Sequence, residues 1–124
     1  MRVLLTGAFG NVGLPTLREL LQHGHHVRCF DVPSRRTRKL ARGFGNQMET
    51  IWGDIRDARR VHEAVAGQDA VVHNAALLPP VTEKSPELAA AVNVGGTRSL
   101  VAAAEAAPSP PVLIFTSSGS KGER

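Results

Sequence analysis

Tyrosine is absent from this 124-residue sequence, and cysteine and tryptophan occur once each. The single cysteine, Cys29, excludes an internal disulfide, so we expect a cytoplasmic protein. With no tyrosine, one tryptophan and four phenylalanines, few side chains can stack on bases, which disfavours a nucleic-acid partner. No apolar run approaches the roughly 20 residues that span a bilayer, so no membrane partner is expected either.

Positive charge is concentrated in one short stretch. The formal net charge is +4, and residues 35–42 carry four arginines and one lysine. Such a cluster can attract nucleic acid or a phosphorylated ligand. A charge run is more often a solvated helix face, and we favour that interpretation.

Short β-branched runs alternate with longer helical stretches, which is typical of βαβ units around a parallel sheet. The sequence predicts an α/β fold of the Rossmann type, with a doubly wound parallel sheet of five strands in the order 3-2-1-4-5. Strands are expected at residues 2–6, 26–31, 47–52, 69–73 and 112–116, and helices at residues 11–23, 34–42, 57–66 and 86–107. The side chains expected to face the core are Val12, Leu17, Leu20 and Leu21 in the first helix and Val61 and Val65 in the third. One domain is expected over residues 1–118, followed by a polar tail at 119–124.

Three glycines lie between the first expected strand and the first expected helix, at Gly7, Gly10 and Gly13. The first allows a sharp turn, the second lets the backbone approach a pyrophosphate, and the third allows close helix packing. The N–H groups at the start of the helix then face the phosphates. The alternative is a tight turn with no ligand, but the position between a strand and an amphipathic helix favours dinucleotide binding.

An acid, Asp31, ends the second expected strand. A carboxylate there can accept hydrogen bonds from the adenosine ribose, which favours NAD, and it repels the 2′-phosphate of NADP. Arg35 and Arg36 follow closely and can attract that phosphate. We favour NAD, with NADP as the alternative.

A second acid, Asp54, follows the third expected strand, and its carboxylate can meet an adenine amino group while Ile55 packs on the ring. Either Asp54 or Asp57 can cap the helix at 57–66. Asp57 suits the cap better by position, which leaves Asp54 free for a ligand.

Five stretches of the sequence resemble the extended short-chain dehydrogenase/reductase group, the NAD-dependent epimerase/dehydratase family that includes UDP-glucose 4-epimerase. They occur in the family's order and together cover essentially the whole chain. The stretches are residues 6–13, 53–57, 73–76, 93–97 and 115–118.

The resemblance implies roles for further residues. Asn11 and Val12 would lie at the pyrophosphate, and Ser118 would be the catalytic hydroxyl that bonds the substrate oxygen. The remaining cofactor contacts implied by the resemblance are Asn74, Ala75, Ala76, Leu77 and Asn93. The family also needs a Tyr-x-x-x-Lys pair on the next helix, which this chain does not contain, and the residues after Ser118 depart from the usual aromatic-glycine pattern.

The sequence therefore predicts the NAD(P)-binding part of a nucleotide-sugar epimerase/dehydratase or related oxidoreductase, incomplete as a catalyst. The alternatives are a non-catalytic dinucleotide-binding or sensor module, and a protein whose missing half comes from a partner chain. The fifth strand is expected to be an unprotected edge, which favours self-association.

Several other residues carry no expected chemistry. His23, His25 and His26 are read as an ordinary helix-to-strand turn, so no metal is expected. His73 is expected to be a packed position, and nothing near Cys29 suggests an activated thiol.

Overall fold

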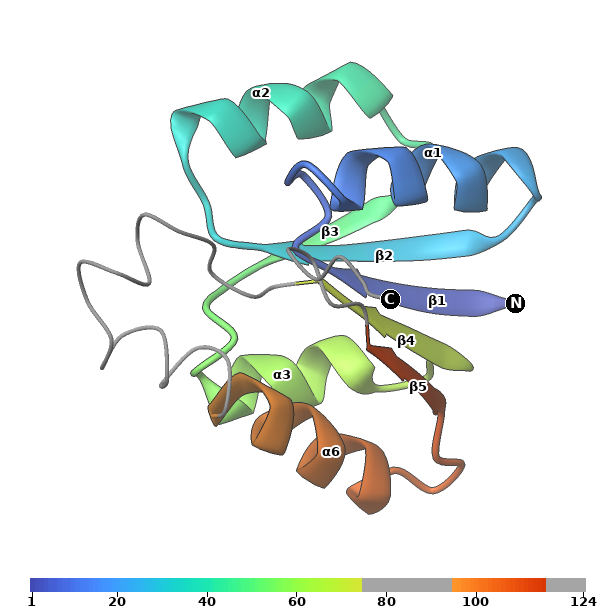
Figure 1. Ribbon diagram of the computed structural model, residues 1–124, viewed down its shortest axis with the longest axis vertical. Coiled ribbons are helices and arrows are strands. Elements are labelled where there is room, and N and C mark those ends of the chain that lie inside the picture. Colours follow the sequence, from blue (N-terminus) through green and yellow to red (C-terminus); the bar gives the residue numbers. More distant parts are fainter. Residues whose placement is uncertain (75–94, 116–124) are drawn as a thin grey trace, which may run out of the picture.

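The computed structural model describes residues 1–74 and 95–115, which form a five-stranded parallel sheet between two layers of helices (Figure 1). The strand order is β3-β2-β1-β4-β5, which confirms the predicted order 3-2-1-4-5. The strands are β1 (Arg2–Thr6), β2 (His26–Asp31), β3 (Glu49–Trp52), β4 (Ala70–His73) and β5 (Val112–Phe115).

Two helices cover each face of the sheet, as Figure 1 shows. On one face lie α1 (Gly13–Gln22) and α2 (Arg35–Phe44), and on the other lie α3 (Ala58–Val65) and α6 (Gly96–Ala106). A sheet covered on both faces can bury both sets of alternating side chains, and in β1 and β4, where both sets are buried, the sequence is an almost continuous apolar run. The sequences of β2 and β3 mix polar and apolar residues.

The central strand β1 divides the core into two apolar clusters. Val3 and Leu5 belong to the cluster under α1 and α2, whereas Leu4 belongs to the cluster against α3 and α6. This alternation follows from the two-residue period of a strand. Leu17 of α1 joins the first cluster, and Val61 of α3 joins the second.

The first helix is shorter than predicted. It begins at Gly13 and not at residue 11, and Val12, which precedes it, is 37% exposed. The prediction that Val12 faces the core is therefore wrong, because the turn that enters the helix directs this residue to the surface. Leu17 is fully buried, and Leu20 and Leu21 pack on the same cluster as expected.

The helices α2 and α3 agree with their predicted positions to within two residues at each end. Val61 and Val65 of α3 are buried, as expected. The predicted helix at 86–107 corresponds to α6 in its second half, and its first part lies outside the described residues. Among the residues that the structure describes, no helix has the length and apolar character needed to cross a membrane.

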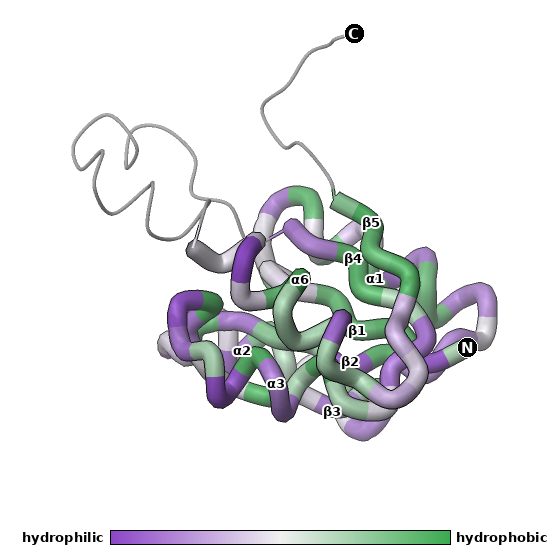
Figure 2. Tube along the Cα trace, turned by 90° about the horizontal axis from the view of Figure 1, so that it is seen from below, coloured by the Kyte–Doolittle hydropathy of each residue, from purple (hydrophilic) through white to green (hydrophobic). Residues whose placement is uncertain are grey.

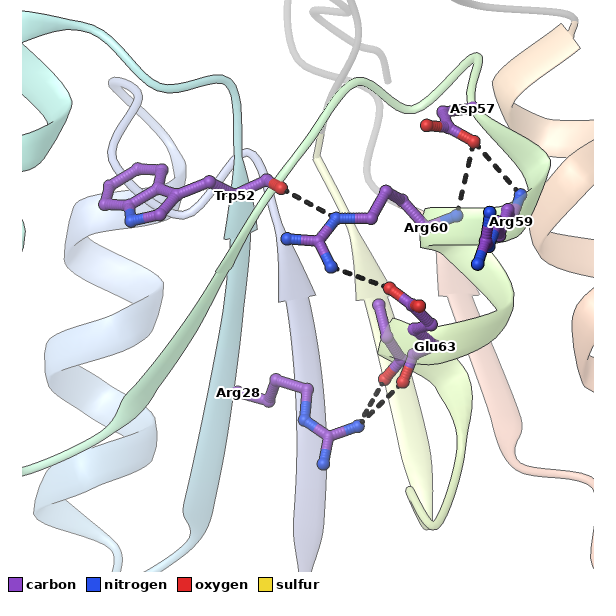
Figure 3. Close-up of polar contacts among 7 residues, drawn as sticks. Arg28, Trp52, Asp57, Arg59, Arg60 and Glu63 are labelled. Carbon is purple, nitrogen blue, oxygen red and sulfur yellow. Dashed lines mark hydrogen bonds and ion pairs between the residues drawn. The ribbon is translucent and has the colours of Figure 1, made fainter.

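Arginine side chains fix α3 against the sheet (Figure 3). Arg28 of β2 donates to the backbone carbonyls of Glu63, Ala64 and Ala66, at 3.2, 2.9 and 2.9 Å, where the helix ends and its carbonyls lack helical partners. Arg60 donates from α3 to the carbonyl oxygen of Trp52 at 3.0 Å. These contacts set the position of the loop 53–57, which joins β3 to α3.

Candidate functional site

The candidate site lies at the carboxyl ends of the parallel strands, where β1 stands between β2 and β4. The chain leaves β1 toward β2 on one side and later reaches β4 on the other, so the connections diverge at this point. Ligands of open α/β sheets bind in the crevice that such a divergence creates. The loops after β1, β2 and β3 and the residue after β4 meet there.

Two glycines of the loop after β1 are required by the backbone itself. Gly7 has a φ of 62°, a conformation that L side chains rarely adopt, and its N–H donates to the carbonyl of Phe30 at 2.9 Å. A Cβ atom on Gly13 would lie 2.0 Å from the Gly7 carbonyl oxygen, so only glycine fits at the start of α1. The turn and close-packing roles predicted for these two glycines are consistent with this geometry.

Gly10 differs from its two neighbours in the pattern. A Cβ atom there would make only an ordinary contact, 3.5 Å from the carbonyl oxygen of Gly7. Internal packing therefore does not require glycine at this position. The space beside Gly10 would let a ligand come close to the backbone there.

The start of α1 carries no side-chain cap, unlike the starts of α2 and α3. Ser34 accepts from the N–H of Thr37 to cap α2, and Asp57 accepts from the N–H groups of Arg59 and Arg60 to cap α3. Val12 precedes α1 and makes no such bond. Within α1 itself, the Leu14 N–H donates to the Gly10 carbonyl at 3.0 Å and Pro15 has no N–H, so an acceptor from outside would meet the N–H groups of Asn11, Val12 and Gly13. The helix dipole favours an anionic acceptor there.

Asp31 joins the glycine-rich loop to the end of β2. One carboxylate oxygen accepts from the Phe9 N–H at 3.0 Å and the other accepts from the Val32 N–H at 2.8 Å. Both bonds hold the half-buried carboxylate beside the glycine-rich loop. Because a carboxylate oxygen can accept more than one hydrogen bond, Asp31 retains capacity for ligand hydroxyls.

Aromatic contacts support the same loop, and the sequence analysis did not find them. The ring of Phe9 is fully buried and lies 5.8 Å, centroid to centroid, from the ring of Trp52 at the end of β3. The guanidinium of Arg38 lies 5.7 Å from the centre of the Trp52 ring. In the sequence, these contacts could have been suspected only from the single tryptophan, Trp52, which stands at the end of a strand.

The sequence predicted a free Asp54 carboxylate, but in the structure this carboxylate is engaged by Arg56. The Asp54 carboxylate accepts from the backbone N–H and the Nε–H of Arg56, at 2.9 and 3.0 Å, and pairs with the rest of that guanidinium. The hydrogen bond from the Arg56 side chain holds the pKa of Asp54 below its usual value. The predicted capping role of Asp57 is confirmed.

Ile55 belongs to the core and not to a ligand surface. The Ile55 side chain is 4% exposed and packs against Gly96 of α6. A Cβ atom added to Gly96 would lie only 2.8 Å from the Ile55 side chain. The prediction that Ile55 packs on a ring is corrected accordingly, because its side chain holds α6 in place. Only the backbone of Ile55 remains for a ligand at this edge.

A buried threonine links the ends of β1 and β4. The hydroxyl of Thr6 lies 2.6 Å from Nδ1 of His73 and accepts from the Asn74 N–H at 2.9 Å. Burial lowers the pKa of His73 to about 4, so its imidazole is neutral near pH 7. His73 is also packed edge-on against Phe115, with ring centroids 5.8 Å apart, as expected for a packed position.

The structure places some of the predicted site residues and leaves others undescribed. Arg35 is exposed in the first turn of α2. Burial raises the pKa of the Cys29 thiol to about 12, so it is not activated. Within residues 1–74 and 95–115 no cluster of three or more His, Cys, Asp or Glu side chains could hold a metal ion. The predicted residues outside the described parts are Ala75, Ala76, Leu77, Asn93 and Ser118.

The parallel sheet, the glycine-rich loop and the acid at the end of β2 define a Rossmann domain of the dinucleotide-binding class. The sequence pattern of the 3-beta hydroxysteroid dehydrogenase/isomerase family matches residues 4–121, and the chain belongs to that family. Over 124 aligned residues it is 39% identical to the 3 beta-hydroxysteroid dehydrogenase/Delta 5→4-isomerase of Mycobacterium tuberculosis, covering 96% of this chain and 32% of the relative.

Solved structures confirm the resemblance to extended short-chain dehydrogenases. A UDP-glucose-4-epimerase from Stenotrophomonas maltophila, with bound NAD and formylated UDP-arabinopyranose, is 31% identical with a TM-score of 0.81, covering 96% of this chain and 37% of that one. A short-chain dehydrogenase/reductase superfamily protein from Agrobacterium tumefaciens, with bound NAD, is 32% identical with a TM-score of 0.73, covering 96% and 33%. The chain thus spans about a third of the length of these relatives.

The buried His73 predicts a loss of stability in mild acid. Its folded pKa of about 4 lies below the ordinary value of 6.5, so the unfolded chain binds the proton more readily. The free energy of unfolding should fall as the pH drops from about 6.5 to 4, by about 2 kcal/mol between pH 7 and pH 5. Urea unfolding at a series of pH values measures this fall.

The matched variant is His73→Gln, which removes the titrating group. Its stability should be lower at pH 7 but should change little between pH 7 and pH 5. An equal pH dependence in the variant and the parent would show that His73 is not the responsible group.

Proposed function

We propose that this chain binds NAD across the carboxyl edge of the sheet, with the diphosphate against the start of α1. The observation that carries the proposal is the uncapped helix start behind the glycine-rich loop, with the Asp31 carboxylate held beside it by the Phe9 N–H. In this arrangement the N–H groups of Asn11 and Val12 receive the diphosphate, and the missing Cβ of Gly10 leaves room for it.

Asp31 is proposed to bind the adenosine ribose and to select NAD over NADP. Its two backbone hydrogen bonds fix the carboxylate at the end of β2, where ribose hydroxyls can donate to it. The exposed Arg35 and Arg36 nearby carry the opposite preference, since they can attract a 2′-phosphate. The Asp31 carboxylate is held in place by two hydrogen bonds whereas Arg35 and Arg36 are exposed, and we therefore retain NAD with NADP as the weaker ligand.

The remaining predicted residues complete the proposed site. Asp54 meets the adenine amino group, with Arg56 holding its carboxylate, and the Ile55 backbone lies beside it. Asn74 lines the cofactor at the end of β4, where Thr6 fixes its backbone. By resemblance, the other proposed contacts are Ala75, Ala76, Leu77 and Asn93, and Ser118 is the proposed catalytic hydroxyl.

In a longer protein, we propose that this domain serves an oxidoreductase or epimerase. NAD supplies hydride transfer, and the protein supplies position and electrostatics. The family points to a hydroxysteroid substrate, and the epimerase similarity points to a nucleotide sugar. The sequence contains no tyrosine, so a tyrosine acid/base must come from outside it, and we expect this chain alone to bind NAD without turnover. The absence of tyrosine also favours a non-catalytic binding module as the second candidate function.

The single buried Cys29 is a free thiol, which fits a cytoplasmic location.

The Asp31→Asn substitution tests the site through the ratio of two affinities. The parent should bind NAD about tenfold more tightly than NADP. Like charges about 4 Å apart repel by roughly 1 kcal/mol even in water, which accounts for a factor of about five in this preference. Asp31→Asn should reduce the preference to about twofold. Titration followed by Trp52 fluorescence and by calorimetry gives both dissociation constants.

Asp69→Asn is the matched control, because Asp69 also accepts a backbone N–H, that of Arg2 at 2.8 Å, at the opposite edge of the sheet. It should leave the NAD-to-NADP ratio unchanged. Equal weakening of both cofactors by Asp31→Asn would assign Asp31 a structural role only. A parent that binds neither cofactor would refute the proposed function.

We infer further that two copies of the chain associate through β5. This strand pairs only with β4 among the described strands, and its hydropathy is apolar along its length (Figure 2). Its apolar residues are exposed, with Val112 at 63%, Ile114 at 46% and Phe115 at 48%. An apolar strand with a free edge is a site for pairing with another chain. A second copy presents the same edge.

Light scattering over a concentration series tests this association. The parent should form dimers or larger species as concentration rises, and Ile114→Lys should shift the equilibrium toward monomer by about tenfold. Val32→Lys, which alters another exposed valine on the loop after β2, should have no effect. A parent that stays monomeric at high concentration contradicts the inference.

A further inference from the structure

The outer face of α2 carries the strongest concentration of charge in the described structure. Five cations occupy this helix, which is more than the formal net charge of +4 for the whole chain. They are Arg35, Arg36, Arg38, Lys39 and Arg42, all exposed. Leu40, Ala41 and Phe44 lie on the opposite side of the helix and pack on the core, so the cations form one continuous stripe on the solvent side.

None of these five cations has an ion-pair partner in the described parts of the chain. The three ion pairs found there join Arg28 to Glu49, Arg56 to Asp54 and Arg60 to Glu63. Residues 32–48, which include all of α2, contain no aspartate or glutamate. The stripe therefore lacks an internal counter-charge, and an anionic partner would not have to displace one.

A groove runs between this stripe and the edge of the sheet. Its volume is about 400 Å³, and its lining combines the two cations Arg38 and Arg42 with the apolar Met48 and the Trp52 side chain. The groove therefore offers an apolar floor and a positive rim on the same side of the molecule.

The strand that borders the groove has a free edge. Among the described strands, β3 is the last of the sheet on this side and pairs only with β2. Gly53 donates its N–H to the backbone carbonyl of Asp31 in β2 at 3.0 Å. Since alternate residues of a strand point to opposite neighbours, the N–H groups of Thr50 and Trp52 point outward. An extended chain can pair with such an edge.

We propose that this groove, bordered by β3 and α2, binds an extended acidic segment of a partner protein whose alternate residues are apolar. The partner's backbone pairs with the outer edge of β3, its carboxylates meet Arg38 and Arg42, and its apolar side chains lie over Ala41 and Met48. A nucleic acid fits less well, because the Trp52 ring is already packed on Phe9 and covered by Arg38, and is not available for stacking on a base.

Fluorescence anisotropy with a labelled ten-residue peptide of alternating Glu and Val tests the proposal. The parent should bind it saturably, and more weakly as salt is added. The double variant Arg38→Gln/Arg42→Gln should bind about fivefold more weakly, since two exposed ion pairs are lost. Arg18→Gln/Arg59→Gln removes the same charge from exposed positions on α1 and α3 and should change the affinity less than about twofold.

Two further probes make the result independent of how well the variants fold. A neutral peptide of alternating Gln and Val should bind the parent about fivefold more weakly than the Glu-Val peptide. A ten-nucleotide oligo-dT should also bind more weakly. Absence of saturable binding, equal loss in the two double variants, or oligo-dT binding as tight as that of the Glu-Val peptide would each overturn the proposal.

Discussion

The hydrogen bond from the Phe9 N–H to the Asp31 carboxylate is the contact on which the candidate site depends. It joins the loop after β1 to the end of β2, at the point where the sheet opens. Gly7 reinforces the same junction by donating to the Phe30 carbonyl, and the Phe9 ring packs on Trp52 of β3. One loop is thus tied to two neighbouring strands, and the tie places a fixed carboxylate beside the uncapped start of α1.

Close packing at Gly13 fixes the start of α1 against the loop after β1. Because a Cβ atom would lie 2.0 Å from the Gly7 carbonyl oxygen, the start of α1 rests directly on the turn that begins the loop. The helix N–H groups are consequently held at one position relative to Asp31 before any ligand arrives. Thr6 also connects the end of β1 to the end of β4, through its contacts with His73 and Asn74. A preorganised site of this kind loses less conformational entropy when a ligand binds.

The sequence predicted the sheet well because its signals are local and repeated. Arg2–Thr6 and His26–Asp31 were placed without error. The first is a short apolar run before a glycine-containing turn, and the second alternates polar and apolar residues after one. The roles of Gly7 and Gly13 were inferred from their spacing together with their position between a strand and an amphipathic helix. Asp31 was found from its position at the end of a strand, although its bond to Phe9 could not be.

The remaining details depend on contacts between residues that are distant in sequence or on local geometry that spacing does not specify. Ile55 is buried because Gly96, far along the chain, leaves space for it. Asp54 is engaged because Arg56 folds back onto it within a tight turn, whereas the sequence only showed that Asp57 was the better cap. The position of Val12 on the surface depends on where the turn ends, and helix boundaries are the least predictable feature of a fold.

The central claim is that a dinucleotide places its diphosphate against the start of α1, and amide NMR with added NAD tests it most directly. The account predicts that the largest shifts of backbone N–H signals occur at Gly10, Asn11 and Val12, with a further shift of the Trp52 indole. Unchanged signals at those three residues, together with shifts centred elsewhere or no shifts at all, would contradict it.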